Sequence, residues 1–131
     1  MSYFWIFLGG GLGSMARFAM AGWITSLLGA AFPWGTLMVN VSGSLVIGWF
    51  AALTDYSDHP GLSASMSRQF VMVGLCGGYT TFSAFSLQTL NLIREGDWIK
   101  AAANASLSVL LCLLAVGLGH GIAGQFVSAR R

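Results

Sequence analysis

Long charge-free stretches dominate the pattern of apolar and polar positions along the chain. An ionised side chain in the hydrocarbon of a bilayer costs about 3 kcal/mol on insertion scales, so these stretches locate membrane-spanning segments. The longest stretch, 18–54, is nearly twice the roughly 20 residues that one helix needs to cross a bilayer, and Pro33 interrupts it. It therefore contains the end of one helix and the whole of another. The pattern predicts four transmembrane helices, at about 3–28, 33–54, 69–93 and 99–127.

The composition agrees with this pattern. Of 131 residues, 56% are apolar and 8% are charged, whereas about a quarter of the residues in a typical soluble domain are charged. The apolar character continues to the C-terminus, unlike that of a secretory signal peptide followed by a polar protein. We therefore expect a single all-α domain over 1–131, surrounded by the lipid bilayer. The few basic residues are scattered, which argues against nucleic-acid binding.

Lysine and arginine are almost evenly divided between the two expected faces of the membrane. Four spans place both termini on one side, together with three arginines, and leave one arginine and one lysine on the other side. The first set is Arg68, Arg130 and Arg131, and the second is Arg94 and Lys100. Because the positive-inside rule then gives little preference, the chain is expected to insert in both orientations. Four short helices enclose little space alone, so we expect an antiparallel homodimer.

Glycine supplies 18 residues, and several pairs lie four positions apart. Small residues at this spacing let helix backbones approach closely. We therefore expect close helix packing at three pairs. They are Gly9 with Gly13, Gly74 with Gly78, and Gly117 with Gly121.

Arg17 is the only ionised residue well inside an expected span, because all four acidic residues fall in expected loops. A proton-coupled exporter of organic cations needs a buried acid, so this pattern argues against that class and favours an anionic solute. Arg17 itself either lines a water-filled vestibule or reaches the membrane interface with its long side chain. No nucleophile with an adjacent base and no carboxylate cluster is visible, so we expect no enzymatic activity.

The third helix is predicted to break near the membrane midplane. Its centre, GLCGGYTTFSAFS over 74–86, combines paired glycines with β-branched threonines, and both disfavour a helix. Carbonyls freed at this depth must be buried in protein or line a cavity, and in broken-helix transport proteins they commonly coordinate Na⁺. If a dimer axis passes here, carbonyls of two chains converge on one cation.

Several side chains near the midplane suggest a narrow anion pathway. Asn40 lies on a weakly polar face of the second helix, and its amide either links two helices or donates to a passing anion. Phe82 and Phe85 share one face of the third helix, where they are either ordinary core or present electropositive ring edges to an anion. Polar lines accompany them, formed by Thr80, Ser83 and Ser86 and by Asn104, Ser108 and Cys112.

Three motifs together resemble the Fluc (CrcB) family of fluoride channels over essentially the whole chain. They are GGGLGSMARF at 9–18, GTLMVNVSG at 35–43 and GGYTTFSAFS at 77–86. The resemblance implies a multi-pass protein of the inner (plasma) membrane, assembled as an antiparallel, dual-topology homodimer with two pores. Through these pores fluoride would leave the cell passively.

The resemblance also implies roles for single residues. Phe82 and Phe85 look like the pore phenylalanines, and Asn40 looks like the pore asparagine. The backbone oxygens of Gly77 and Thr80 look like those that hold a structural Na⁺ at the dimer axis. The pore would further include Ser83, Ser86 and Ser108, and the vestibule would include Arg17. We add Asn104 to the expected pore because it lies four residues before Ser108 on the fourth helix. Departures from the family pattern occur at Ala84, Gln88 and Asn104, where Thr, Glu and Tyr are frequent.

A non-transporting structural membrane subunit is the alternative function. Such a protein would use the same polar midplane only to hold helices together. The two hypotheses differ in whether liposomes that contain the protein release fluoride.

Overall fold

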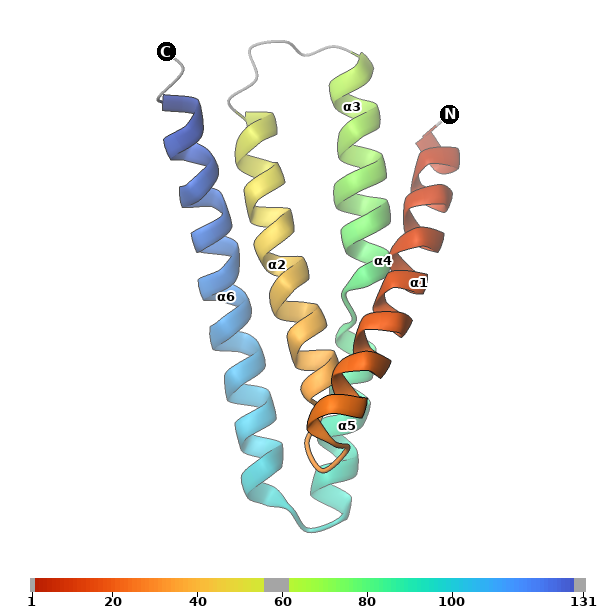
Figure 1. Ribbon diagram of the computed structural model, residues 1–131, viewed down its shortest axis with the longest axis vertical. Coiled ribbons are helices and arrows are strands. Elements are labelled where there is room, and N and C mark those ends of the chain that lie inside the picture. Colours follow the sequence, from red (N-terminus) through yellow and green to blue (C-terminus); the bar gives the residue numbers. More distant parts are fainter. Residues whose placement is uncertain (1, 56–61, 129–131) are drawn as a thin grey trace.

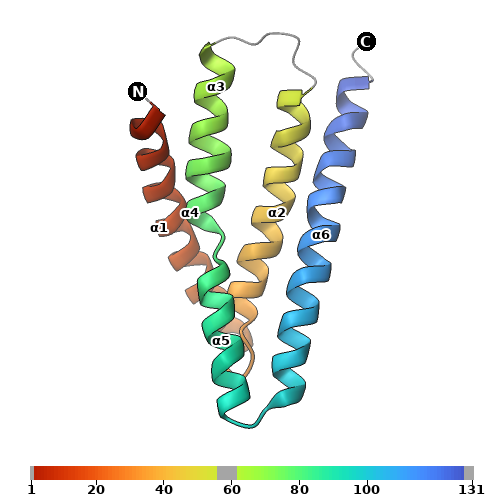
Figure 2. The same ribbon diagram turned by 180° about the vertical axis from the view of Figure 1, so that it is seen from behind.

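The computed structural model describes residues 2–55 and 62–128, which form four long helical arms (Figure 1, Figure 2). Asp58, His59, Arg130 and Arg131 lie outside the described residues. Three arms are single helices, namely α1 (Ser2–Leu28), α2 (Trp34–Asp55) and α6 (Trp98–Ser128). The remaining arm is composed of α3 (Leu62–Arg68), η1 (Gln69–Cys76), α4 (Gly77–Tyr79) and α5 (Phe82–Arg94).

All four described arms are long and apolar enough to cross a membrane, which confirms the four predicted spans. Both ends of the chain lie at the same end of the bundle (Figure 1). The third arm begins earlier than predicted, because the helix continues through Arg68 and its apolar span covers Ser65–Arg94. A long basic side chain near the end of a span can extend to water, so Arg68 does not end the helix.

The α1 helix packs against the third arm through glycine backbone on both sides. A Cβ built on Gly13 would meet the carbonyl oxygen of Leu75, and one built on Gly78 would lie 2.5 Å from a carbonyl oxygen of α1. The absence of side chains therefore lets the two backbones touch. The close packing predicted for Gly9 with Gly13 and for Gly74 with Gly78 is confirmed.

The second close crossing joins α2 and α6, and it uses glycines other than those predicted. A Cβ on Gly48 would meet the carbonyl oxygen of Val116, and Gly119 lies as close to the α2 backbone. By contrast, a Cβ on Gly117 or Gly121 would meet nothing within 4 Å in the described chain, so this predicted pair makes no close contact within the single chain. Because α6 is apolar almost all round, its pattern does not indicate which face meets a neighbour.

The third arm is interrupted halfway along its length, at Thr80 and Thr81. Their backbones are extended, with φ and ψ of −79° and 158° at Thr80 and of −152° and 114° at Thr81. The break lies within the predicted centre of the arm, 74–86, but it involves only the threonines and not the paired glycines. Gly77 and Gly78 instead remain helical in α4, and the π-helix η1 precedes them. Threonine suits extended backbone because it is β-branched.

Short connections close the end of the bundle opposite the termini. Gly29 after α1 and Gly96 after α5 have positive φ, 82° and 81°, which glycine adopts without steric cost. Asp97 then caps α6, because its carboxylate accepts a hydrogen bond from the backbone N–H of Lys100 at 3.3 Å. The side chain of Lys100 also donates to this carboxylate, which lowers the pKa of Asp97.

Candidate functional site

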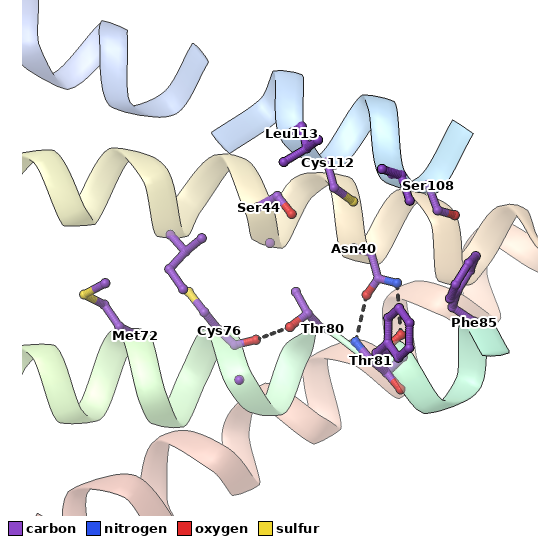
Figure 3. A pocket seen from close by; sticks show the side chains of 15 residues that line it. Asn40, Ser44, Met72, Cys76, Thr80, Thr81, Phe85, Ser108, Cys112 and Leu113 are labelled. Atoms are coloured by element: carbon purple, nitrogen blue, oxygen red, sulfur yellow. Dashed lines mark hydrogen bonds between the residues drawn. The ribbon is translucent and has the colours of Figure 1, made fainter. Parts of the chain in front are cut away.

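A side chain of another helix holds the interrupted backbone of the third arm. Asn40 of α2 accepts a hydrogen bond from the Thr81 amide through Oδ1 at 2.7 Å, and its Nδ2 donates to the Thr81 carbonyl at 3.0 Å (Figure 3). In an unbroken α-helix that amide would donate to the carbonyl of Gly77. The Asn40 side chain therefore satisfies both polar groups of Thr81 at a depth where water is scarce. Because Nδ2 carries two hydrogens, one remains for another acceptor.

A groove of about 420 Å³ lies beside the break, between the third arm, α2 and α6. Asn40, Phe82, Phe85 and Ser108 all line it, so the structure brings together four residues that the sequence predicted for one pathway. Figure 3 labels three of them, Asn40, Phe85 and Ser108. The two rings are neighbours, with centroids 5.3 Å apart and planes inclined at 48°. Phe82 is 77% exposed in the single chain and is therefore not part of its core.

The hydroxyl of Ser108 is a buried polar group without a partner. Ser108 is 7% exposed, and its Oγ has no hydrogen-bond partner among the described residues. Leaving a buried hydroxyl unsatisfied costs about 1 to 3 kcal/mol. Since Ser108 lines the groove, this hydroxyl can serve a ligand or a water molecule there.

Thr80 and Cys112 of the predicted polar lines also line the groove, whereas Asn104, Ser83 and Ser86 lie outside its lining. Asn104 is 1% exposed, and its Nδ2 donates to Oγ1 of Thr89 at 2.8 Å, which links α6 to α5. Ser83 and Ser86 are exposed on α5, where their hydroxyls make local hydrogen bonds. Sequence reasoning missed Thr89. Its spacing of four from Phe85 was the available signal, because residues four apart share a helix face.

Arg17 faces a second cavity, of about 580 Å³, which lies on the α1 side of the break between α1, α2 and α5. Its Nη1 donates to the carbonyl oxygen of Thr80 and its Nη2 to Oγ of Ser14, both at 3.5 Å. The guanidinium thus lies beside the break and within the bundle. Thr81 lines both cavities, so the interrupted backbone separates them.

Neither cavity contains an acidic residue among its described lining residues. Glu95 and Asp97 lie in the connection between α5 and α6, and Asp55 is the last residue of α2. The polar groups that remain are amides, hydroxyls and one guanidinium. This set offers hydrogen-bond donors and positive charge, which suits an anion better than a cation.

Gly77 and Thr80, the residues predicted to hold a cation, both line the groove beside the break. The amide and the hydroxyl of Thr80 both donate to the carbonyl of Cys76, at 2.9 and 2.8 Å. The Thr80 carbonyl accepts a hydrogen bond of 3.5 Å from the guanidinium of Arg17. The described residues contain no group of three or more His, Cys, Asp or Glu that could hold a metal ion. A cation bound here would therefore depend on neutral backbone oxygens.

Comparison with known proteins identifies the family. The model of the family described as CrcB-like protein, Camphor Resistance (CrcB), matches residues 4–120. Proteins named Fluoride-specific ion channel FluC from Methylocella silvestris, Opitutus terrae and Rhodospirillum rubrum are 54%, 55% and 53% identical to this chain. The alignments cover 94%, 90% and 92% of this chain and 93%, 89% and 92% of the respective relatives. The chain therefore belongs to the CrcB-like family of fluoride-specific ion channels.

Proposed function

We propose that the protein is a fluoride-selective channel of the inner (plasma) membrane, which exports cytoplasmic fluoride passively and so lowers fluoride toxicity. The observation that carries this proposal is the groove that gathers Asn40, Phe82, Phe85 and the unpartnered hydroxyl of Ser108. The names of the FluC relatives support the choice of fluoride.

The chemistry of the groove suits this small and strongly hydrated anion. Fluoride that enters a narrow path loses water, and donors along the path must replace it. The hydroxyl of Ser108, the remaining hydrogen of Asn40 Nδ2 and the electropositive edges of the two rings are such donors. A narrow path also excludes larger halides. HF crosses membranes from acidic surroundings and ionises in the cytoplasm, so an open path releases the trapped anion without energy coupling.

The two phenylalanines provide the direct test of the pathway. Phe82→Ile and Phe85→Ile keep apolar bulk but remove the ring edge. We expect each to lower fluoride efflux from liposomes by about tenfold. This corresponds to a rise of roughly 1.4 kcal/mol in the free-energy barrier to fluoride transport. The measurement uses a fluoride electrode on vesicles loaded with fluoride and chloride.

Phe7→Ile is the matched control, because Phe7 is 76% exposed on α1 and lines neither cavity. It should leave efflux unchanged. Wild-type vesicles that retain fluoride would instead favour the structural subunit. Unchanged efflux in both pore variants would return Phe82 and Phe85 to a packing role.

The proposed channel is an antiparallel homodimer. Two features support it: the exposed ring of Phe82, which a second copy could cover, and the three-to-two division of basic residues. Reporter domains fused to the C-terminus should therefore appear on both sides of the membrane. Two or three lysines added to the connection at 94–100 should shift nearly all molecules to one orientation. A single orientation in the unmodified protein would contradict the antiparallel dimer.

A structural Na⁺ at the dimer axis completes the proposal. The carbonyls of Gly77 and Thr80 from two chains would supply four neutral oxygens, which suit a monovalent cation better than Mg²⁺. Its charge would offset the cost of holding anions nearby at low dielectric. Replacing Na⁺ with a large organic cation should lower both fluoride flux and dimer stability. If both persist in protein shown to be free of Na⁺, the cation assignment is wrong.

A further inference from the structure

Arg17 connects α1 to the backbone on both sides of Tyr79. Its guanidinium donates to the Thr80 carbonyl and to Ser14, and the hydroxyl of Ser14 donates to the Gly78 carbonyl, each at 3.5 Å. Arg17 lines the cavity on the α1 side of the break, and no acidic residue lines that cavity in the described chain. The guanidinium is therefore paired with neutral oxygens and not with a carboxylate.

The position of these carbonyls explains why a positive charge is stable there. The helical part of the third arm that runs through η1 and α4 ends at Tyr79, and Thr80 is extended. The last carbonyls of a helix have no intrahelical partner and carry the negative end of its dipole. The guanidinium of Arg17 therefore occupies a helix C-terminus, a favourable place for a cation.

The Na⁺ of the proposed function would use the same helix end and one of the same atoms. We propose that Arg17 is a positioning residue that competes with this cation for the Thr80 carbonyl. Without the cation, the guanidinium lies on this oxygen and stabilises the break. When the cation binds, repulsion between the two positive charges displaces the guanidinium into its cavity. The inference rests on the proposed Na⁺ site, and it goes beyond that site by giving Arg17 control of cation affinity.

Displacement also links the cation to the anion. A guanidinium released from Thr80 is free to attract an anion into the α1-side cavity. Binding of one ion then raises the affinity for the other, and such coupling is reciprocal. Na⁺ would thus prepare the cavity for fluoride although it is not itself transported.

The test measures Na⁺ affinity rather than flux. The thermal unfolding midpoint of the full-length protein in detergent is followed as Na⁺ replaces N-methylglucamine at constant ionic strength. Arg17→Gln and Arg17→Met remove the charge, and both should lower the half-saturating Na⁺ concentration by about tenfold, because the repulsion is lost. Both should also be less stable than the wild type without Na⁺.

Two controls separate charge from packing. Arg17→Lys keeps the positive charge, and Ser14→Ala removes a hydroxyl while leaving Arg17 in place. Both should stay within about threefold of the wild-type half-saturation. A purely structural role for Arg17 predicts the opposite sign, because a damaged break would bind Na⁺ more weakly.

Each result decides a different question. Unchanged or weaker Na⁺ binding in the charge-removing variants would overturn the competition. A wild-type protein that does not respond to Na⁺ would overturn both the cation site and this inference. If the wild type responds to Na⁺ but its liposomes release no fluoride, the channel proposal fails, and the Arg17 variants still decide the inference.

Discussion

Replacing Asn40 with aspartate is expected to lower fluoride efflux by about a hundredfold, which corresponds to roughly 2.7 kcal/mol. The substitution keeps the shape of the side chain but removes Nδ2, which donates to the Thr81 carbonyl at 3.0 Å. A carboxylate oxygen would then face that carbonyl, and two acceptors repel each other. The new negative charge would also line the groove proposed for an anion. Loss of the break geometry and repulsion of fluoride both lower fluoride efflux.

The matched control for this variant is Asn91→Asp. Asn91 is exposed near the end of α5 and lines neither the groove nor the Arg17 cavity. The same chemical change there should leave efflux within about twofold of wild type, as expected for surface substitutions. Efflux above half of the wild-type rate in Asn40→Asp would show that Asn40 neither holds the break nor faces fluoride.

Gly13→Ala is expected to have the largest effect on stability. The added Cβ would meet the Leu75 carbonyl oxygen and lie 2.8 Å from the Tyr79 amide nitrogen. Both are backbone atoms, so no side-chain rotation relieves the contact and the two helices must separate. We expect destabilisation of at least about 3 kcal/mol, the upper part of the usual range for overpacking. The readout is the thermal unfolding midpoint and the yield of monodisperse protein in detergent.

Gly11→Ala supplies the comparison within the same helix. A Cβ at Gly11 would meet nothing within 4 Å, so the same methyl group should be tolerated there. Equal stability of the two variants would mean that α1 and the third arm are not in backbone contact at Gly13.

The four spans could be predicted because charge is excluded from hydrocarbon at almost any position along a span. The position of the break was harder. Helix propensity is poor at the paired glycines and at the threonines alike, yet Gly78 packs against the α1 backbone, and α4 remains helical there. The break lies at Thr80 and Thr81, and Asn40, 41 residues from Thr81 in sequence, binds both backbone groups of Thr81. Local propensity contains no information about such a distant partner.

In the candidate site, too, the sequence could predict some features and not others. Asn40, Phe82, Phe85 and Ser108, which the sequence assigned to one pathway, line one groove, because each lies near the middle of its span. The sequence could not indicate that Asn104 is paired with Thr89, since that pairing depends on how α5 and α6 rotate about their axes. For the same reason the spacing rule chose Gly117 and Gly121 on α6, whereas Gly119 makes the contact.

The double hydrogen bond between Asn40 and Thr81 has a mechanical consequence. A helix interrupted at two extended residues would bend freely if its backbone groups were unpaired. Here the Thr81 amide and carbonyl are both anchored to α2, at 2.7 and 3.0 Å. Bending would break both bonds where little water can replace them. We therefore expect the interruption to act as a rigid joint and not as a hinge, with the width of the proposed path set when the protein folds. The proposed channel would then discriminate between anions without a moving part.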